Sequence, residues 1–281
     1  MDFNMFTQLF TKIDQGTKTY ITDISSKTIA TITPFVSIGI TIAFIIYGWL
    51  IIRGAIDIPL SGFVNRFMRI SIITSIALTT GLYQSDIANL ITQMPSELSK
   101  AFLKSPLSEQ ELIALLDKTA GYGLKYASRL FEESAFFDNN GTLYALLGFL
   151  LLLATSFVVV IGGGLMILTK VAIVLLVGLG PFFIIALLWQ PTHKFFKQWI
   201  VQILSYTFLF ILLASVFDLM MNIFSNYLSH MGIDSQDNVA YTFGGVFIFS
   251  IIIIILLFKM ISIANALIKG ITFDHLWRHR N

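Results

Sequence analysis

LYALLGFLLLLATSFVVVIGGGLMILTKVAIVLLVGLGPFFIIALLWQPTHKFFKQW, residues 143–199, is the stretch that decides the fold of this chain. From Asn139 to His193 the only charged side chain belongs to Lys170. Crossing the ~30 Å hydrocarbon core of a bilayer takes about 20 apolar residues. The stretch therefore predicts helices that are buried in a membrane.

The same stretch is interrupted in its second half, and it is too short for three spans of about 20 residues each. Gly178, Gly180 and Pro181 lie close together there. Proline has no backbone N–H and breaks a helix, and broken backbone at membrane depth must be covered by protein or by a wet cavity. We expect one full span near 141–165, followed by a bent or re-entrant segment near 171–192.

Further apolar runs flank this stretch on both sides, and the composition of the whole chain agrees with them. The chain is 56% hydrophobic and 12% charged, with a mean hydropathy of +0.81, whereas soluble domains carry about 25% charged residues. The fold class predicted is an all-α, polytopic transmembrane protein with about five crossings, one broken or re-entrant segment and an amphipathic N-terminal helix. The other expected spans are 32–52, 70–91, 198–217 and 241–259.

The remaining segments predict helices and a tail outside the hydrocarbon core. An apolar stripe in residues 1–31 indicates an amphipathic helix on the outer leaflet. Residues 92–138 hold five basic and seven acidic residues and predict a periplasmic helical segment, in which Ser108 and Glu111 have the spacing of a capping box. In chain order the expected segments are 1–31, 32–91 with the first two transmembrane helices, 92–138, the C-terminal transmembrane cluster 139–268 and the basic tail 269–281.

The distribution of Lys and Arg in short loops predicts the orientation, because such loops favour the cytoplasm. Basic side chains lie in 53–69, in 194–197 and in the tail, so these segments should be cytoplasmic. The N-terminus and residues 92–138 should then be periplasmic. The alternative is six crossings, with 194–197 and the tail outside, which violates the same rule twice.

The candidates for a structural or functional role are Trp199, Pro181, Gly178, Gly180, Pro191 and Lys170. A lysine at membrane depth costs ~2.5–3.5 kcal/mol on insertion scales, so Lys170 should face protein or water; the alternative is that it reaches the interface from a helix end. Trp199 should lie near the cytoplasmic start of the next span and fix that span against the broken segment. The alternative is an interfacial tryptophan that faces lipid.

Enzyme signatures are absent from the sequence. It contains no Gly-x-Ser-x-Gly, His-Glu-x-x-His, P-loop or Gly-x-Gly-x-x-Gly motif. The absence of cysteine excludes disulfides and thiolate-bound metals. We therefore expect no catalytic residue, no cofactor and no metal site.

The segment Gly178-Leu-Gly-Pro181-Phe-Phe, continued by Trp189-Gln-Pro191-Thr-His-Lys-Phe-Phe-Lys-Gln-Trp199, resembles the TrbL/VirB-six family. These proteins are the polytopic inner-membrane subunits of type IV secretion and conjugation machines. The order of expected segments also agrees over nearly the whole chain. Trp199 looks like the tryptophan that is functionally important in that family.

The resemblance implies an inner-membrane channel and assembly subunit that helps translocate protein effectors or relaxase-bound single-stranded DNA and helps build the pilus. The implied partners are pilin and pilus-tip subunits, the inner-membrane scaffold and the secretion ATPases. We also expect a homo-oligomeric ring such as a pentamer, with the helix near 108–133 close to its axis.

A secondary transporter of a small solute is the alternative from another functional class. Such transporters are built from related halves with paired broken helices and ionisable residues near the middle of the membrane. This chain has one broken element, no internal repeat and one central charge, Lys170.

Overall fold

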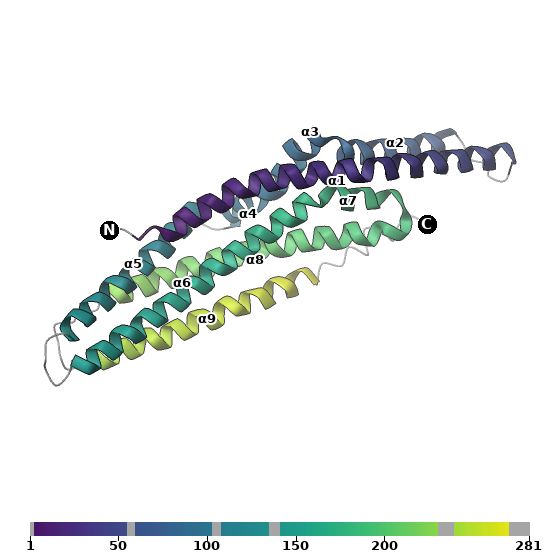
Figure 1. Cartoon of the computed structure of the whole chain (residues 1–281). Coiled ribbons are helices and arrows are strands. Elements are labelled where there is room, and N and C mark those ends of the chain that lie inside the picture. The colour runs from purple at the N-terminus through teal and green to yellow at the C-terminus, as the bar shows by residue number, and fades with distance from the viewer. Residues whose placement is uncertain (1–2, 55–59, 103–107, 135–140, 230–238, 270–281) are drawn as a thin grey trace. The chain divides into compact units, whose positions relative to one another are not determined.

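The computed structural model describes residues 3–54, 60–102, 108–134, 141–229 and 239–269, and these residues are helical with short connections. No strand occurs in the described ranges, in agreement with the predicted all-α class. The helices are labelled in Figure 1. Their bounds are α1 Met5–Ile52, α2 Leu60–Leu78, α3 Thr80–Leu82, the π-helical η1 Tyr83–Ala88, α4 Asn89–Phe102, α5 Glu109–Ser134, α6 Gly141–Gly178, α7 Gly180–Ile185, the 3-10 turns η2 Ala186–Leu188 and η3 Gln190–Thr192, α8 His193–Ser229 and α9 Val239–Lys269.

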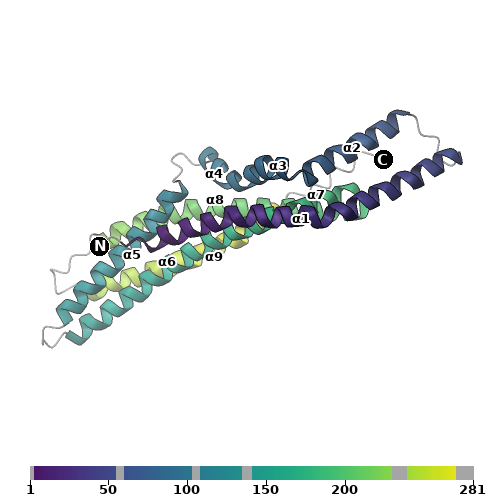
Figure 2. The same cartoon turned by 45° about the horizontal axis from the view of Figure 1, so that its top comes forward.

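The chain forms two compact units, and the first consists of residues 1–14, 95–170 and 205–281. Its core is a cluster of buried apolar side chains from the start of α1 and from α5, α6, α8 and α9. Leu116 of α5, Val158 of α6, Phe217 of α8 and Leu257 of α9 are all completely or almost completely buried there. In Figures 1 and 2 these parts of α6, α8 and α9 run side by side.

Helix α5 begins and packs as its sequence predicts. The backbone N–H of Ser108 donates to the Glu111 carboxylate at 2.6 Å, and the backbone N–H of Glu111 donates to Ser108 Oγ at 3.2 Å. This is the reciprocal capping box. Leu112, Leu116, Gly123, Ala127 and Leu130 recur at helical spacing along α5, and all of them are buried.

Helix α1 corrects one expectation. The surface helix expected over 1–31 and the span expected over 32–52 form one continuous helix. Pro34 lies inside α1 without ending it. At 1.5 Å per residue, the 48 residues of α1 extend about 72 Å, more than twice the ~30 Å of hydrocarbon.

The second unit consists of residues 15–94 and 171–204, and in it the segment after α1 returns along α1. Near one end of this pairing, Phe63 and Phe67 of α2 pack against Phe44, with ring centroids 6.4 and 6.3 Å apart. Near the other end, Gln84 of η1 donates to Thr22 O at 3.0 Å. The returning segment is not the continuous helix that we expected over 70–91, because it breaks at Thr79, whose backbone is extended (φ −85°, ψ 101°).

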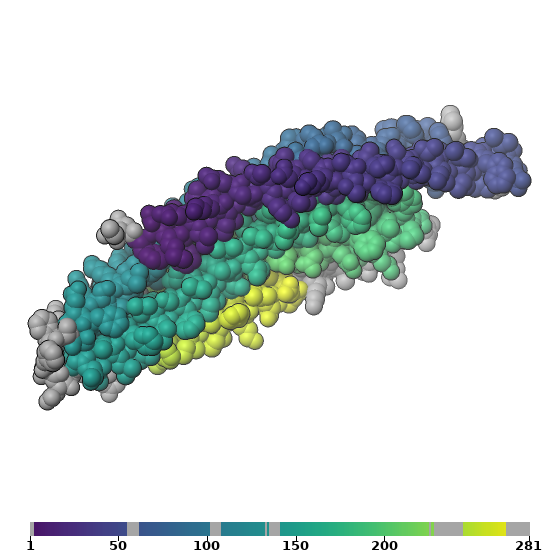
Figure 3. All heavy atoms as spheres, in the orientation of Figure 1, coloured from purple at the N-terminus to yellow at the C-terminus, as the bar shows by residue number. Residues whose placement is uncertain are grey.

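The second half of α1 presents a row of exposed apolar side chains. Figure 3 shows α1 uncovered on the face drawn. The spacing of these side chains alternates between three and four residues, as in a helix seam that meets a partner or lipid. The row consists of Phe35, Ile38, Ile42, Ile45, Trp49 and Ile52.

The predicted interruption after Gly178 is present, but the helix before it is longer than expected. Helix α6 runs without a break from Gly141 to Gly178, so the boundary that we expected between 165 and 171 does not exist. The chain then passes through α7, η2 and η3 before α8 begins at His193. Within the described residues, four helices are long and apolar enough to cross a membrane: they lie in Met5–Ile52, Gly141–Gly178, Gln190–Phe224 and Gly244–Leu267.

Some expectations fall on residues outside the described ranges. They include most of the basic tail, 270–281, and part of the loop 53–69.

Candidate functional site

The Gly178–Pro181 break leaves a carbonyl that α-helical hydrogen bonding cannot satisfy, and a distant tyrosine covers it. Pro181 lies in the first turn of α7. Because proline has no N–H, the carbonyl four residues earlier, Val177 O, loses its helical donor. The hydroxyl of Tyr83, a fully buried residue of η1, donates a short hydrogen bond to Val177 O. π-Helical segments such as η1 are frequent at functional sites.

A second carbonyl without a helical donor lies next to Pro191, at the end of the 3-10 turn η2. The extended backbone of Trp189 (φ −115°, ψ 134°) ends this turn, so Leu187 O has no donor from a following helical turn. Arg69 of α2 donates from Nη2 to Leu187 O at 3.3 Å, and His193 Nε2 lies 2.9 Å from the same oxygen. Side chains of the segment α2–η1 therefore cover the carbonyls that are left without helical donors at Pro181 and at the end of η2.

Trp199, near the start of α8, also contacts the broken segment. Its indole Nε1–H donates to Leu176 O at 2.9 Å, and its ring stacks on Phe183 of α7 with centroids 5.9 Å apart and planes 13° apart. The side chain is 3% exposed. Trp199 thus packs against the broken segment, as the sequence predicts, and the alternative of a lipid-facing tryptophan does not fit its burial.

Gly180 allows this arrangement because it has no side chain. A Cβ atom at this position would collide with the Tyr83 hydroxyl and would lie 3.0 Å from Trp199 Cζ2. A Cβ at Gly178 would lie 3.1 Å from Ile24 Cγ2 of α1. Both glycines therefore permit close packing at the break, in addition to weakening the helix.

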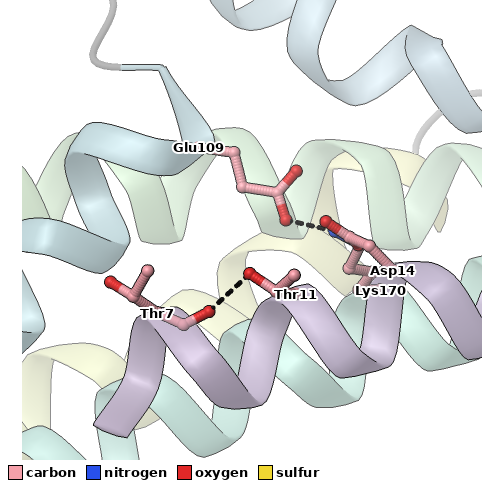
Figure 4. A network of polar contacts seen from close by, with 5 residues as sticks. All are labelled: Thr7, Thr11, Asp14, Glu109 and Lys170. Atoms are coloured by element: carbon pink, nitrogen blue, oxygen red, sulfur yellow. Dashed lines mark hydrogen bonds and ion pairs between the residues drawn. The ribbon is translucent and has the colours of Figure 1, made fainter. Parts of the chain in front are cut away.

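Lys170 lies in a different unit from the break and forms an ion-pair cluster, shown in Figure 4. Its ammonium group pairs with Asp14 of α1 and, at 2.5 Å, with Glu109 at the start of α5. Lys170 is mostly buried, whereas Asp14 is about half exposed. Lys170 therefore faces protein carboxylates, which is the first of the two alternatives for this residue.

A buried carboxylate in the same unit fixes the start of α1. The backbone N–H groups of Phe6 and Thr7 donate to Asp117 of α5 at 2.8 and 2.9 Å, and Thr7 Oγ1 donates to it at 2.7 Å. The first N–H groups of a helix have no partner within the helix, so a carboxylate there acts as an N-cap. Here the cap comes from another helix, and it ties α1 to α5.

Sequence reasoning missed the partners at these sites. Tyr83 and Arg69 lie about a hundred residues before the carbonyls that they cover, and Asp14, Glu109 and Asp117 lie in segments that we assigned to other roles. Pro181 did indicate carbonyls without helical donors, but nothing local identified the side chain that would donate to them. Among the described residues, no group of three or more His, Asp or Glu could hold a metal ion.

Comparison with known proteins identifies the family of this chain. A model of the family described as TrbL/VirB6 plasmid conjugal transfer protein matches residues 40–260, which include the break and Trp199. The chain belongs to the TrbL/VirB6 family. The resemblance stated from the sequence is thereby confirmed.

Individual TrbL/VirB6 relatives agree over most of the chain. It is 28% identical over 239 residues to the type IV secretion system protein VirB6 of Brucella abortus biovar 1 (strain 9-941), covering 82% of this chain and 68% of the relative. It is 26% identical over 251 residues to the protein of the same name from Bartonella quintana (strain Toulouse), covering 87% and 75%. The Bartonella henselae protein is 26% identical over 256 residues, covering 89% and 76%.

These TrbL/VirB6 similarities confirm the role predicted from the resemblance. The chain is a type IV secretion subunit and a multi-pass protein of the inner membrane. They give no support to a small-solute transporter.

Proposed function

We propose that the chain is a channel and assembly subunit of the inner-membrane complex of a type IV secretion system. In this proposal it helps translocate protein or single-stranded DNA and helps build the pilus, and it hydrolyses nothing itself. Membership of the family and the similarity to type IV secretion proteins support the role.

One observation carries the mechanistic part of the proposal: side chains donate hydrogen bonds to the backbone carbonyls at the helix break. Trp199, Tyr83 and Arg69 each donate to a backbone carbonyl in the segment from Leu176 to Leu187. Each unsatisfied carbonyl in a membrane costs several kcal/mol. Because moving the helices apart would leave these carbonyls unsatisfied, the break holds its helices in a fixed arrangement, which we call the joint. We infer that this joint sets the position of α8 relative to α7, and that substrate passage depends on it.

Substitution of Trp199 tests the proposal. Trp199→Ala removes the indole donor and the stacking on Phe183, so we expect substrate transfer to be lost while membrane insertion and protein level stay near normal. Trp199→Phe retains a ring that can stack and loses only the hydrogen bond, so its effect should be milder. Transfer of a reporter effector and conjugation frequency are the measurements.

Phe157→Ala is the control, because the aromatic Phe157 of α6 is 56% exposed and lies outside both the joint and the apolar row of α1. It should transfer substrate like the wild type. Normal transfer by Trp199→Ala would refute the role of the joint. Loss of the protein from the membrane would instead assign Trp199 to folding.

We further propose five crossings, with a periplasmic N-terminus and a cytoplasmic C-terminus. Four crossings would be made by α1, α6, α8 and α9, which are long and apolar enough. The fifth would be α2–η1. This segment runs beside the part of α1 from Thr22 to Phe44, which is about 33 Å long at 1.5 Å per residue. Reporter fusions should place α5 outside and the C-terminus inside; a C-terminus found outside would refute this topology.

The partners follow from membership of a secretion machine, and we propose pilin and pilus-tip subunits, the inner-membrane scaffold and the ATPases. We also propose a homo-oligomeric ring such as a pentamer. The apolar row of α1 supports a contact between copies, and the charged exposed face of α5, with Lys118, Lys125 and Arg129, suits a water-filled axis. Native mass spectrometry in mild detergent should detect the ring, and a monomer under conditions that preserve comparable complexes would count against it.

A further inference from the structure

A pocket of about 360 Å³ lies within the second unit, between α1, α2 and the residues around Pro191. This is within the size range of small-ligand sites. Ile40 and Phe44 of α1 and Phe63 and Ile73 of α2 form apolar walls. Arg66, Arg69, Gln190 and His193 add polar groups to the same pocket.

The two arginines give the pocket a positive charge that the described part of the chain does not neutralise. Arg66 and Arg69 are three residues apart in α2, so they share one helix face. The Arg66 guanidinium lies over the Tyr47 ring, 5.0 Å from its centroid, and Arg69 gives one N–H to Leu187 O. Within the described ranges, the ion pairs involve Lys100 and Lys170 and neither of these arginines.

The surroundings of the pocket are apolar. Ile42 and Ile46 of α1 and Phe67 and Met68 of α2 are exposed large hydrophobic residues on the helices that line it. Trp189, which is 39% exposed, also lines the pocket, and tryptophans are enriched at membrane–water interfaces. A ligand that meets all of these groups has an anionic head and apolar chains.

We propose that the Arg66–Arg69 pocket binds an anionic glycerophospholipid. The phosphate lies between the two guanidinium groups, which match its geometry with paired N–H donors. The acyl chains follow the exposed apolar residues of α1 and α2. Basic pockets between transmembrane helices bind anionic lipid head groups by the same chemistry.

The lipid also has a mechanical consequence. Arg69 covers the carbonyl of Leu187 at the end of η2, so a phosphate at Arg69 adds a contact to a side chain that already holds the broken segment. Bound lipid thereby stabilises the second unit. The proposal does not depend on the channel role, because it concerns only lipid binding.

Native mass spectrometry on the delipidated full-length protein tests the proposal. Phosphatidylglycerol and phosphatidylethanolamine with the same acyl chains are added separately. We expect the wild type to retain at least one phosphatidylglycerol with about ten-fold preference, equivalent to about 1.4 kcal/mol. Equal retention of the two lipids would overturn the proposal.

Two variants and one control locate the site. Arg66→Gln removes a charge whose guanidinium lies over the Tyr47 ring of α1, and Ala43→Phe fills the pocket from α1 without changing any charge. Both should lose the preference for phosphatidylglycerol. Arg129→Gln is the matched control, since Arg129 is also exposed and also lies over a tyrosine ring, that of Tyr126, and it should keep the preference.

Other outcomes of these experiments also test the assignment of a lipid to the pocket. Retention of the preference by folded Ala43→Phe would show that general surface charge, not the pocket, attracts the lipid. Displacement of phosphatidylglycerol by an equal amount of inorganic phosphate would show a free-anion site and overturn the lipid assignment. If Arg66→Gln fails to fold, Ala43→Phe and the lipid discrimination of the wild type still decide.

Discussion

Replacing Tyr83 by phenylalanine removes one oxygen atom and, with it, the hydrogen bond to Val177 O at the Gly178–Pro181 break. The ring remains, so the packing of this fully buried side chain is nearly preserved. The oxygen that loses its donor has no helical alternative, because Pro181 has no N–H. We expect the variant to be less stable than the wild type.

The size of the effect follows from the state of that carbonyl. Leaving a buried acceptor unsatisfied costs about 1–3 kcal/mol, and hydrogen bonds between membrane helices average about 0.6 kcal/mol. A loss of about 1–2 kcal/mol, in the lower part of the first range, is therefore expected. For a chain of this length, that corresponds to a fall in Tm of about 2–8 °C.

A second substitution tests whether the missing N–H is the reason. In Pro181→Ala the residue at 181 has a backbone N–H that can donate to Val177 O. Tyr83→Phe should then cost less in the Pro181→Ala background than in the wild type. We expect a coupling free energy of about 1 kcal/mol between the two sites, within the usual range for residues that share a partner.

Thermal and denaturant unfolding of the four purified proteins in mild detergent, followed by circular dichroism, measures the double-mutant cycle. Tyr144→Phe is the control, because the partly buried Tyr144 hydroxyl makes no hydrogen bond with the described residues. It should leave stability almost unchanged. Additivity of Tyr83→Phe and Pro181→Ala within about 0.5 kcal/mol would refute the reasoning.

Three further predictions concern the first unit. Lys170→Met should lower stability by about 1–2 kcal/mol in denaturant unfolding at low salt, because it leaves Asp14 and Glu109 close together without their cation; an exposed ion pair alone would contribute less than about 1 kcal/mol. Asp117→Ala should cost about 2 kcal/mol and increase proteolysis near residue 5, since it removes the cap of α1; unchanged cleavage would contradict the docking. The backbone N–H of Ser108 lowers the pKa of Glu111 below 4.5. Glu111 therefore stabilises the fold above pH 4.5, and this contribution is lost as the pH falls through the lowered pKa. Acid unfolding of Glu111→Gln should lack this pH-dependent contribution.

The sequence by itself determined the features that depend on local chemistry. Long uncharged runs can be satisfied only in a membrane, so the all-α, multi-pass class followed from composition and length. Ser108 and Glu111 marked the start of α5 because a capping box needs only residues three apart. Gly178, Gly180 and Pro181 marked the break because the missing N–H is a property of proline itself.

Where helices continue and where they break was only partly local. Residues 1–31 and 32–52 differ in polarity and so were expected as two elements, yet α1 is one helix, since a change of polarity along a chain does not interrupt its hydrogen bonding. The break at Thr79 has no proline, and Gly81 follows it within α3. The break is explained by the packing of η1, in which Tyr83 contacts α6 and Gln84 contacts α1.

Only the tertiary structure decided the partners of the charged and uncovered groups. Lys170 was expected to face protein or water, but Asp14 and Glu109 are 156 and 61 residues away, and no periodicity links such positions. Pro181 indicated carbonyls without helical donors, but the tertiary structure alone showed that Tyr83 donates to Val177 O and that Arg69 donates to Leu187 O. A proline dictates that a carbonyl loses its helical donor; the fold alone dictates which side chain replaces it, because that depends on which helices lie within hydrogen-bonding distance.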